Sequence, residues 1–405
     1  MSTQPPPPLT TIHGVPGREE FRLDPAVGHL NHGSFGAVPS RTIDYRAELT
    51  TRLEANPFRW FEELPPRHAS VRAAISSFVG APPSEIAMVA NASAAASTLF
   101  ASIPLRSRDE VLITDHTYGA VAMGAQRYAR HWGASVRTAP VPHAARSNET
   151  LATILDSVTD HTRMVIVDHI SSATARLFPV VELVEALADR DIIVAIDGAH
   201  SLGILPEASV RAERAVWFGN LHKYPCAPRG AAVLVAQGDL AQRLFPIIDS
   251  WGAELPFPER FDLQGSVDST GFLSAAHAID TLEEQFGWDR IRAYSAELGA
   301  WAATTIASAL GDLMDVDPTP DVGMPVPQQP LLRLPPGVAA DPDGARLLKN
   351  RLAVEAGCEA GVTTWSGTGF MRISAHAYNE AADYEQFLDR GIPVIASLRT
   401  GAQHV

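Results

Sequence analysis

The strongest constraint on the fold is an alternation of short apolar runs with helical segments over residues 86–236. Each run has the length of a buried strand. The runs are EVLITD (110–115), MVIVDHI (164–170), DIIVAID (191–197), AVWFGN (215–220) and GAAVLVA (230–236). Between two of them, residues 180–190 place Val181, Val184 and Leu187 on one face of a predicted helix. This alternation predicts an α/β fold with a mostly parallel sheet and helices on both faces.

Polar side chains stand at the carboxyl ends of these predicted strands. They are Asp115, His169, Asp197 and Asn220. In parallel sheets, ligands bind just beyond the carboxyl ends of the strands. The sequence therefore predicts a small-molecule site at this edge of the sheet.

The length of the chain predicts more than one domain, because its 405 residues exceed the ~250–300 at which a single core stops growing. We expect a large domain over 71–270. A smaller C-terminal α/β domain is expected over 271–405, where a Pro-rich connection (317–330) follows predicted helices. Residues 17–70 are expected to pack with the small domain. The polar, Pro-rich residues 1–16 are expected to form a flexible arm.

Composition excludes several classes of function. The formal net charge is −14 and no cluster of Lys and Arg opposes it, which argues against nucleic-acid and membrane partners and favours a small-molecule partner. No apolar run reaches the ~20 residues of a membrane span, and no signal-peptide pattern opens the chain. Two cysteines, Cys226 and Cys358, form neither a disulfide framework nor a metal cluster. We expect a cytoplasmic enzyme without a metal.

One lysine is placed where an amine has a use. The chain has 32 Lys and Arg residues, and only Lys223, in WFGNLHKYP (217–225), and Lys349 are lysines. Arginine serves at ion pairs and phosphate sites, but its pKa above ~12 prevents it from losing a proton and attacking a carbonyl. A solvated surface lysine is the alternative. The position beyond a strand end favours a functional amine.

Two further motifs suit a phosphorylated, electron-withdrawing cofactor. The triplet Asn91-Ala92-Ser93 opens an Ala-rich helix, where backbone N–H groups and a serine hydroxyl suit a phosphate; an ordinary helix cap is the alternative. In DGAH (197–200), Asp197 ends a strand so apolar that its carboxylate needs a cation. A protonated pyridine nitrogen is such a cation, and a helix cap is again the alternative.

Together the Asn-Ala-Ser, Asp-His, Asp-Gly-Ala-His and Asn-Leu-His-Lys motifs resemble the fold-type I, class V aminotransferase family of pyridoxal-phosphate enzymes. Five segments look most like the isopenicillin N epimerase-like branch: LNHGSFGAVP (30–39), DHTYGA (115–120), HISSATA (169–175), LQGSVD (263–268) and RISAHAYN (372–379). The resemblance covers residues 30–379. It implies a large domain with a mostly parallel mixed sheet flanked by helices, plus a smaller C-terminal α/β domain.

The resemblance implies pyridoxal 5′-phosphate as the cofactor. Lys223 would hold it covalently and move protons at the substrate Cα, Asp197 would pair with the pyridine nitrogen, and His116 would stack on the ring. The other cofactor contacts that it implies are His200 and Ser172 near the phenolic oxygen, and Asn91, Ala92, Ser93, Asn220 and His222 at the phosphate.

The resemblance also implies a partner subunit and a substrate site. Gly265 and Ser266 match a segment that reaches the phosphate of the neighbouring subunit, which implies a homodimer with shared active sites. Arg372 matches the arginine that binds the substrate α-carboxylate through its planar fork. Further substrate-binding candidates are Asn31, Ser34, Arg59 and Tyr118. For Arg59, in NPFRWFEE, an amphipathic helix is an equal alternative.

Several positions depart from the family pattern. Ser172 replaces the asparagine common in cysteine desulfurases, and Ala175 stands where glycine is usual. Desulfurases also carry a nucleophilic cysteine before the carboxylate-binding arginine. Cys358 precedes Arg372 here, but its context, EAGCEAGV, is typical of a helix end. We expect both Cys358 and Cys226 to be structural.

The motifs specify the cofactor more firmly than the reaction. β-Elimination of a C–S bond in a cysteine S-conjugate, within specialised metabolism, is the favoured reaction, by analogy with sulfur lyases of this branch. Epimerisation, transamination and decarboxylation-coupled deamination are the alternatives among enzymes. A non-catalytic binding module that keeps the fold is the alternative from another class, but it would more naturally have lost Lys223, Asp197 or Arg372.

Overall fold

The computed structural model describes residues 4–314 and 316–401, which fold into two compact units. Unit 1 comprises the described parts of Met1–Pro39, Ala173–Arg176 and Leu282–Val405. Unit 2 comprises Ser40–Ser172 and Leu177–Thr281. The first boundary falls inside the segment 17–70 that was expected to pack with the small domain: residues 17–39 belong to unit 1, and residues 40–70 to unit 2.

Unit 2 is built on a seven-stranded sheet of order β2-β8-β7-β6-β5-β3-β4. The strands are β2 (Ile86–Val89), β3 (Glu110–Thr114), β4 (Ser135–Ala139), β5 (Thr162–Asp168), β6 (Ile193–Asp197), β7 (Ala215–Asn220) and β8 (Ala232–Val235). Strands β7, β6, β5, β3 and β4 are parallel, whereas β8 is antiparallel to both of its neighbours. The predicted mostly parallel mixed sheet is confirmed.

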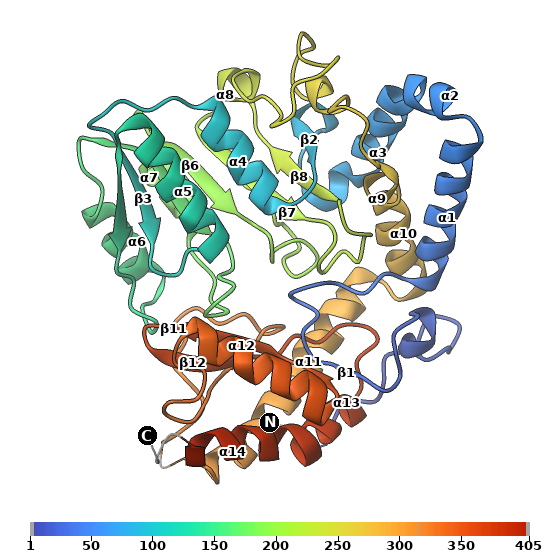
Figure 1. The fold of residues 1–405 in the computed structure, drawn as a ribbon, viewed down its shortest axis with the longest axis vertical. Coiled ribbons are helices and arrows are strands. Elements are labelled where there is room, and N and C mark those ends of the chain that lie inside the picture. The colour runs from blue at the N-terminus through green and yellow to red at the C-terminus, as the bar shows by residue number, and fades with distance from the viewer. Residues whose placement is uncertain (1–3, 315, 402–405) are drawn as a thin grey trace. The chain divides into compact units, whose positions relative to one another are not determined.

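Helices cover the sheet of unit 2, and Figure 1 shows α4 and α5 on the face turned to the viewer. The helices are α1 (Ser40–Ala55), α2 (Pro57–Glu62), α3 (Leu64–Val79), η2 (Pro83–Glu85), α4 (Ala92–Ser102), α5 (Gly119–Trp132), α6 (Ser147–Asp156), α7 (Val180–Ala186), α8 (Gly238–Gln242), η3 (Glu259–Phe261), α9 (Thr270–Leu273) and α10 (Ala275–Gln285), which ends in unit 1. Small side chains of α4, among them Ala95 and Ala96, pack in one apolar cluster with Val111 and Phe218 of the sheet. The small residues allow the helix to lie close to the strands.

Unit 1 holds two small sheets. Strand β1 (Gly28–His29) pairs in parallel with β10 (Cys358–Glu359), and β12 (Thr368–Arg372) lies between β11 (Gly361–Trp365) and β9 (Leu331–Arg333) in antiparallel pairing. The helices are η1 (Gly17–Glu20), α11 (Trp288–Gly311), α12 (Pro342–Arg351), η4 (Leu352–Ala356), α13 (Ala381–Gln386), η5 (Phe387–Gly391) and α14 (Ile392–Gly401). The small C-terminal α/β fold is therefore confirmed, and the N-terminal strand β1 completes it.

The Pro-rich arm expected over residues 1–16 differs from the structure in its second half. Leu9 and Thr11 are buried, and the backbone N–H of Ile12 donates to the carbonyl of Gln285 at 2.8 Å. Residues 1–3 lie outside the described residues. The two buried side chains and the hydrogen bond hold this segment on unit 1, although its composition is that of a flexible chain.

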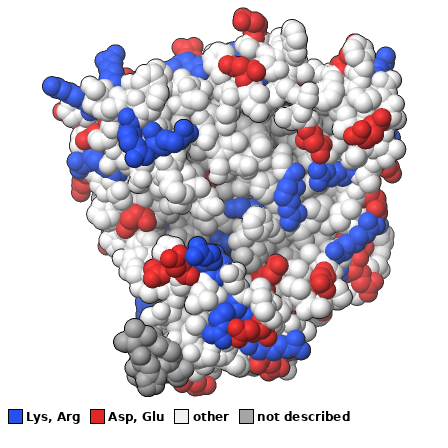
Figure 2. Space-filling view, in the orientation of Figure 1, with Lys and Arg blue, Asp and Glu red and all other residues white. Residues whose placement is uncertain are grey.

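The surface carries both signs of charge. On the face shown in Figure 2, Lys and Arg side chains are interspersed with Asp and Glu. Within residues 4–314 and 316–401, no helix is long and apolar enough to cross a bilayer.

Candidate active site

Lys223 lies in a tight turn directly after β7. The N–H groups of Leu221 and His222 both donate to the carbonyl of Ala231, at 3.0 and 3.3 Å, and the N–H of Cys226 donates to the carbonyl of Lys223 at 2.9 Å. The Lys223 Nζ lies 2.9 Å from His200 Nε2. An ammonium group can only donate, so His200 Nε2 accepts from it. The turn thus fixes the backbone and leaves a partly buried amine beside an imidazole.

Asp197 ends the neighbouring strand β6 with its side chain buried. Its Oδ1 accepts from the N–H of Ala199 at 2.9 Å. Burial raises the pKa of Asp197, while that hydrogen bond and the charge of Lys223 oppose the rise. Within the described chain Asp197 forms no ion pair. A buried carboxylate with so little compensation is a group that a cation would stabilise.

Asp168 is a site residue that the sequence analysis missed. It ends β5 and stands directly opposite Asp197 in the sheet register. Its side chain is buried, and its Oδ2 has no hydrogen-bond partner within the part of the chain that the structure describes. Burial and the charge of Asp197 raise the pKa of Asp168 well above its usual range. The available signal was a carboxylate at the end of an apolar run, the same signal that identified Asp197.

His116 follows β3 at the same edge and is fully enclosed, with 1% of its surface exposed. Its Nε2 lies 2.8 Å from the carbonyl of Val141, and because a carbonyl can only accept, the proton is on Nε2. The ring meets Phe178 edge-on, with centroids 5.5 Å apart, and Ser171 Oγ donates to the His116 carbonyl at 3.2 Å. These contacts hold the imidazole in one orientation, as a stacking residue requires.

The N-terminus of α4 and the end of β7 form one donor-rich corner. Asn91 Oδ1 accepts from the N–H of Ala94 at 2.8 Å, and Asn220 Oδ1 accepts from the N–H of Ala92 at 2.9 Å. The Asn91 side chain is therefore the helix cap. Ser93 is exposed and has no hydrogen-bond partner among the described residues, so its N–H and hydroxyl remain open, as does Asn220 Nδ2. Three donors at a helix N-terminus fit a phosphate.

In the sequence, His222 follows Asn220 by two residues and directly precedes Lys223. Its Nδ1 lies 3.1 Å from the Ala231 carbonyl and carries the proton for the same reason as in His116. Burial, helped by the charge of Lys223, lowers the pKa of His222 to about 4. Without a bound anion this imidazole is neutral at neutral pH.

Gly265 and Ser266 lie on an exposed loop of unit 2 that is fastened at both ends. Gln264 Nε2 donates to the carbonyl of Phe261 at 2.8 Å, and Asp268 Oδ1 accepts from the N–H of Thr270 at 2.8 Å. Gly265 has φ +80°, a left-handed conformation that glycine adopts without a steric penalty. The loop is thus a defined surface feature.

Three of the predicted substrate-binding residues meet in unit 1. Arg372 ends β12 and is buried, and its guanidinium donates to Asn31 Oδ1 at 3.3 Å and to Ser34 Oγ at 3.4 Å. Ser34 Oγ in turn donates to Asn31 Oδ1 at 2.8 Å. The N-terminal segment thereby positions the guanidinium, which is suited to a carboxylate.

The other two substrate candidates have different surroundings. Arg59 lies on α2, is exposed, and forms an ion pair with Glu63 at 2.6 Å, one helical turn away. This pair is what the amphipathic-helix alternative predicts. Tyr118, 46% exposed, precedes the first residue of α5. It lies two residues beyond His116 at the carboxyl edge of the sheet.

The sequence of residues 37–387 matches the family profile described as "Aminotransferase class-V". The chain belongs to this family. Among similar proteins, isopenicillin N epimerase from Amycolatopsis lactamdurans is 28% identical over 394 residues, which cover 92% of this chain and 96% of the relative. Putative L-cysteine desulfhydrase 1 from Oryza sativa subsp. japonica is 29% identical over 421 residues, covering 94% and 86%.

A solved structure of a C-DES mutant, with glycine covalently linked to its pyridoxal-phosphate cofactor, has the same fold. It superimposes with a TM-score of 0.77 at 17% identity and covers 94% of this chain and 99% of its own. The expected fold-type I architecture is therefore confirmed, and this class V protein is a pyridoxal-phosphate-dependent enzyme.

The residues present fit that cofactor. The Lys223 amine can hold an aldehyde, the buried Asp197 carboxylate lacks a cation within the described chain, and the open donors at α4 suit a phosphate. Within the described chain the carboxylate lacks an ion pair and these donors lack an acceptor, and the cofactor would supply both. Ser172, expected near the phenolic oxygen, is partly buried. It follows Ser171, whose hydroxyl donates to the carbonyl of His116.

Two departures from the class V pattern have structural explanations. Ala175, where glycine is usual, has φ +51°, and its side chain packs with Val322, Leu331 and Phe370 of unit 1. The packing offsets part of the cost of a left-handed alanine. Both cysteines are buried: burial raises the pKa of Cys358 to about 11 and that of Cys226 well above its usual range. Neither thiol is a ready nucleophile.

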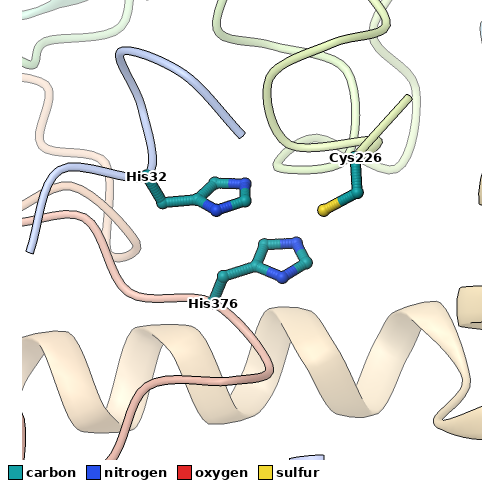
Figure 3. Close-up of side chains that lie close together, drawn as sticks. All are labelled: His32, Cys226 and His376. Carbon is teal, nitrogen blue, oxygen red and sulfur yellow. The ribbon is translucent and has the colours of Figure 1, made fainter. Parts of the chain in front are cut away.

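Sequence analysis also passed over two histidines of unit 1. His32 and His376 stack almost parallel, with centroids 4.1 Å apart and planes inclined by 13° (Figure 3). His32 Nδ1 lies 3.0 Å from the hydroxyl of Tyr378. All three side chains are buried. Tyr378 is thus a hydrogen-bonding partner of His32.

Proposed function

We propose that this class V enzyme cleaves the C–S bond of a cysteine S-conjugate by β-elimination, as a step in specialised metabolism. With one water, the reaction converts the conjugate into a thiol, pyruvate and ammonia. The observation that carries the proposal is the Lys223 amine, held on a rigid turn beside His200 and next to two buried carboxylates. A similar protein named as a putative L-cysteine desulfhydrase supports chemistry at sulfur.

The absence of a reactive thiol separates this proposal from a desulfurase reaction. Cysteine desulfurases resembling this chain attack the substrate sulfur with a cysteine. The chain has two cysteines, and both are buried with raised pKa. Elimination needs no such nucleophile, because the sulfur leaves with the bonding electrons once Cα has lost its proton.

The residues would divide the work as follows. Pyridoxal phosphate, when bound, supplies the electron sink that acidifies the substrate Cα–H. Lys223 would hold the cofactor and then accept the Cα proton, Asp197 would keep a proton on the pyridine nitrogen, and His116 would cover the ring. Further contacts would come from Ser172 and His200 at the phenolic oxygen, and from Ala92, Ser93, Asn220 and His222 at the phosphate. In unit 1, Arg372, with Asn31 and Ser34, would bind the substrate α-carboxylate.

A product survey tests the proposal. The holoenzyme would be incubated with cysteine S-conjugates, cystathionine, and D- and L-amino acids, while thiol, pyruvate, other keto acids, CO₂ and optical activity are measured together. We expect equal amounts of thiol and pyruvate from an S-conjugate. Lys223→Ala serves as the control for cofactor-independent breakdown. Loss of optical activity without pyruvate would contradict the elimination.

Epimerisation is the second candidate, because isopenicillin N epimerase is similar over nearly the full length of both chains. It requires a second proton donor on the face of Cα opposite Lys223. The survey decides between the two reactions, since solvent deuterium would enter Cα without loss of sulfur in an epimerase. Transamination would instead release a keto acid that keeps the sulfur.

We also propose a homodimer with shared active sites. Gly265 and Ser266 are exposed, and so are several apolar side chains from nearby parts of the sequence of unit 2. Those side chains are Phe245, Ile247, Ile248, Trp251, Leu255 and Val267. Trp251 is 92% exposed, and a β-carbon at Gly265 would lie 3.9 Å from Ile248. An apolar surface of this kind is typical of an interface.

Subunit mixing tests the dimer. Lys223→Ala and Gly265→Trp are each expected to be inactive. Refolded or co-expressed together, they should recover about a quarter of the activity, because one site in each mixed dimer has both intact parts. Sedimentation of wild type as a monomer, or no recovery in a mixed dimer verified by differential tags, would contradict shared sites.

A further inference from the structure

A cavity of about 420 Å³ lies at the amino edge of the large sheet in unit 2. Its lining comes from the segment before β3 and from the starts of β5 and β6, with Arg214, which directly precedes β7, and Arg243, which directly follows α8. These strands are parallel, so their amino ends share one edge and their carboxyl ends share the other. A five-residue strand is about 17 Å long, which separates this amino-edge cavity from Asp197 and Lys223.

The amino-edge cavity is rich in arginine. Its charged lining residues are Arg106, Arg163, Arg214, Arg243, Asp109 and Asp191. Arg214 pairs with Asp191 at 2.6 Å, and Arg163 lies 3.6 Å from Asp109. Asp109 is also held by the backbone N–H of Arg106, which donates to its second oxygen at 2.7 Å. The carboxylates of Asp191 and Asp109 are therefore each already paired with an arginine of the lining.

Two guanidinium groups remain without a carboxylate. Within the described chain, the side chains of Arg106 and Arg243 form neither an ion pair nor a hydrogen bond, and both are exposed at the cavity. The charges of Asp109 and Arg243 both act on the buried phenol of Tyr128, which donates to the carbonyl of Ile103, another lining residue. An excess of two positive charges thus stands at one cavity of a chain whose net charge is −14.

The rest of the cavity wall is apolar. It consists of Ile103, Pro104, Leu105 and Ile193. Small-molecule sites usually have this composition, a mainly apolar wall with a few convergent charged groups, and volumes of roughly 300–1,000 Å³. Guanidinium forks bind phosphate oxygens in pairs, and an apolar wall accommodates an organic body.

We propose that the amino-edge cavity is a second anion-binding site, which takes a phosphate-bearing small molecule with an apolar or planar body, such as a nucleoside monophosphate. Arg106 and Arg243 bind the phosphate, and the apolar wall receives the base. The site is separate from the cofactor phosphate corner at α4. Its occupancy does not depend on the reaction proposed for the carboxyl edge.

Calorimetric titration of the holoenzyme tests this site, because bound cofactor fills the phosphate corner at α4. AMP is the main probe, with inorganic phosphate and succinate as the comparison anions, in low-salt buffer. We expect saturable binding of AMP at one site per chain, weaker binding of phosphate, and the weakest binding of succinate. Tighter binding of succinate than of AMP would overturn the phosphate assignment.

Three single variants locate the binding. Arg106→Ala and Arg243→Ala should each weaken AMP binding by roughly ten- to a hundredfold, since each removes a charge-assisted contact. Arg108→Ala is the matched control, an exposed arginine of the same segment that does not line the cavity. It should bind AMP as wild type does. Equal weakening by Arg108→Ala would show diffuse attraction only, and unchanged binding in the first two variants would place AMP elsewhere; either result overturns the proposal.

A fourth variant separates this site from the chemistry. Lys223→Ala, kept saturated with pyridoxal phosphate so that the phosphate corner stays filled, should bind AMP with the wild-type affinity, because Lys223 belongs to the opposite edge of the sheet. Unchanged cofactor absorbance in the Arg106 and Arg243 variants verifies that the fold and the cofactor site are intact. If AMP binding disappears in Lys223→Ala, the nucleotide occupies the active site and the second site does not exist.

Discussion

Aspartate side chains have opposite surroundings at the two edges of the large sheet in unit 2. Asp191, just before β6, is exposed and pairs with Arg214 at 2.6 Å. Asp197, at the end of the same strand, is buried and has no ion pair within the described chain. At the amino edge the protein itself pairs this aspartate, in contact with water. At the carboxyl edge it leaves a charge for a ligand to satisfy.

The difference follows from solvent access. An exposed ion pair contributes roughly 0.2–1 kcal/mol, because water competes with both partners. A buried carboxylate without a cation loses its hydration and regains little, so its pKa rises, as it does for Asp197 and Asp168. The carboxyl edge therefore has the perturbed carboxylates typical of a catalytic site.

The largest effect expected is that of Lys223→Ala, which removes the amine of the carboxyl edge. Activity should fall by at least about 10³-fold, because the group proposed to hold the cofactor and move the proton is lost. Borohydride reduction of wild type, followed by peptide mapping, should find the cofactor on Lys223. Lys349→Ala, the matched variant of the only other lysine, should keep wild-type activity. A reduced adduct on Lys349 would end the assignment.

Asp197→Asn is expected to have the next largest effect. The neutral amide cannot keep a proton on the pyridine nitrogen, so turnover should fall on the order of 10² while much of the cofactor stays bound. Asp189→Asn, an exposed aspartate before the same strand, should change kcat/KM by no more than about twofold. Near-normal turnover of Asp197→Asn would reduce Asp197 to a helix cap and remove the contrast between the edges.

Variants of Arg372 test whether recognition of an amino acid needs this residue of unit 1 in addition to the carboxyl edge of the large sheet. Arg372→Lys and Arg372→Ala should both lower kcat/KM by roughly ten- to a hundredfold with cofactor absorbance unchanged, because an ammonium cannot replace the bidentate fork. Arg333→Lys, on the neighbouring strand β9, is the control. If both Arg372 variants keep wild-type kcat/KM, the substrate carboxylate is bound elsewhere, and Arg59 is the next candidate.

The smallest effect is a pH dependence of stability at Asp168. Its folded pKa is raised above the ordinary value of 3.8, so the folded chain holds a proton that the unfolded chain releases. The stability contribution is complete below pH 3.8 and is lost as pH rises through the folded pKa. Asp168→Asn does not titrate, so it should gain stability relative to wild type as pH rises, by at most about 1.4 kcal/mol per pH unit.

Urea unfolding of cofactor-free protein between pH 5 and pH 8 measures this gain. Asp160→Asn, an exposed aspartate before the same strand, is the control and should follow the wild type across the range. Parallel curves for wild type and Asp168→Asn would mean that Asp168 is ionised with a normal pKa, and that the carboxyl edge holds one perturbed carboxylate instead of two.

The sequence predicted the parts of the site that local pattern controls. The predicted strand ends are observed. A strand is apolar where it is buried in the sheet, and the polar residue that ends the apolar run marks where the chain leaves the sheet. Asp168 was missed because its importance comes from its register with Asp197, which depends on the pairing of two strands. On α7 the pattern placed Val181 and Leu187 on one face, whereas Val181 is 49% exposed and Leu187 is buried, as is Leu183. The orientation of that short helix is set by its neighbours.

Long-range contacts also explain the differences at the N-terminus. The composition of residues 4–16 is that of a free chain, but Ile12 finds a backbone partner in Gln285, far away in the sequence. No local pattern indicates that helices α1 to α3 belong to unit 2 while residues 17–39 belong to unit 1. Predicting either feature requires knowing which surfaces meet.

The turn that carries Lys223 has a consequence for the speed of the enzyme. Four backbone hydrogen bonds hold residues 221–227, including one from the N–H of Ala227 to the carbonyl of Leu221 at 3.0 Å. The Cα of Lys223 is therefore fixed, and its Nζ moves only by rotation about the bonds of a partly exposed side chain. Such rotations take picoseconds to nanoseconds, whereas loop and domain rearrangements take microseconds to milliseconds. In the role proposed for Lys223, the amine would swing away from a new substrate and return many times within one turnover, so its travel would not set the pace of the catalytic cycle.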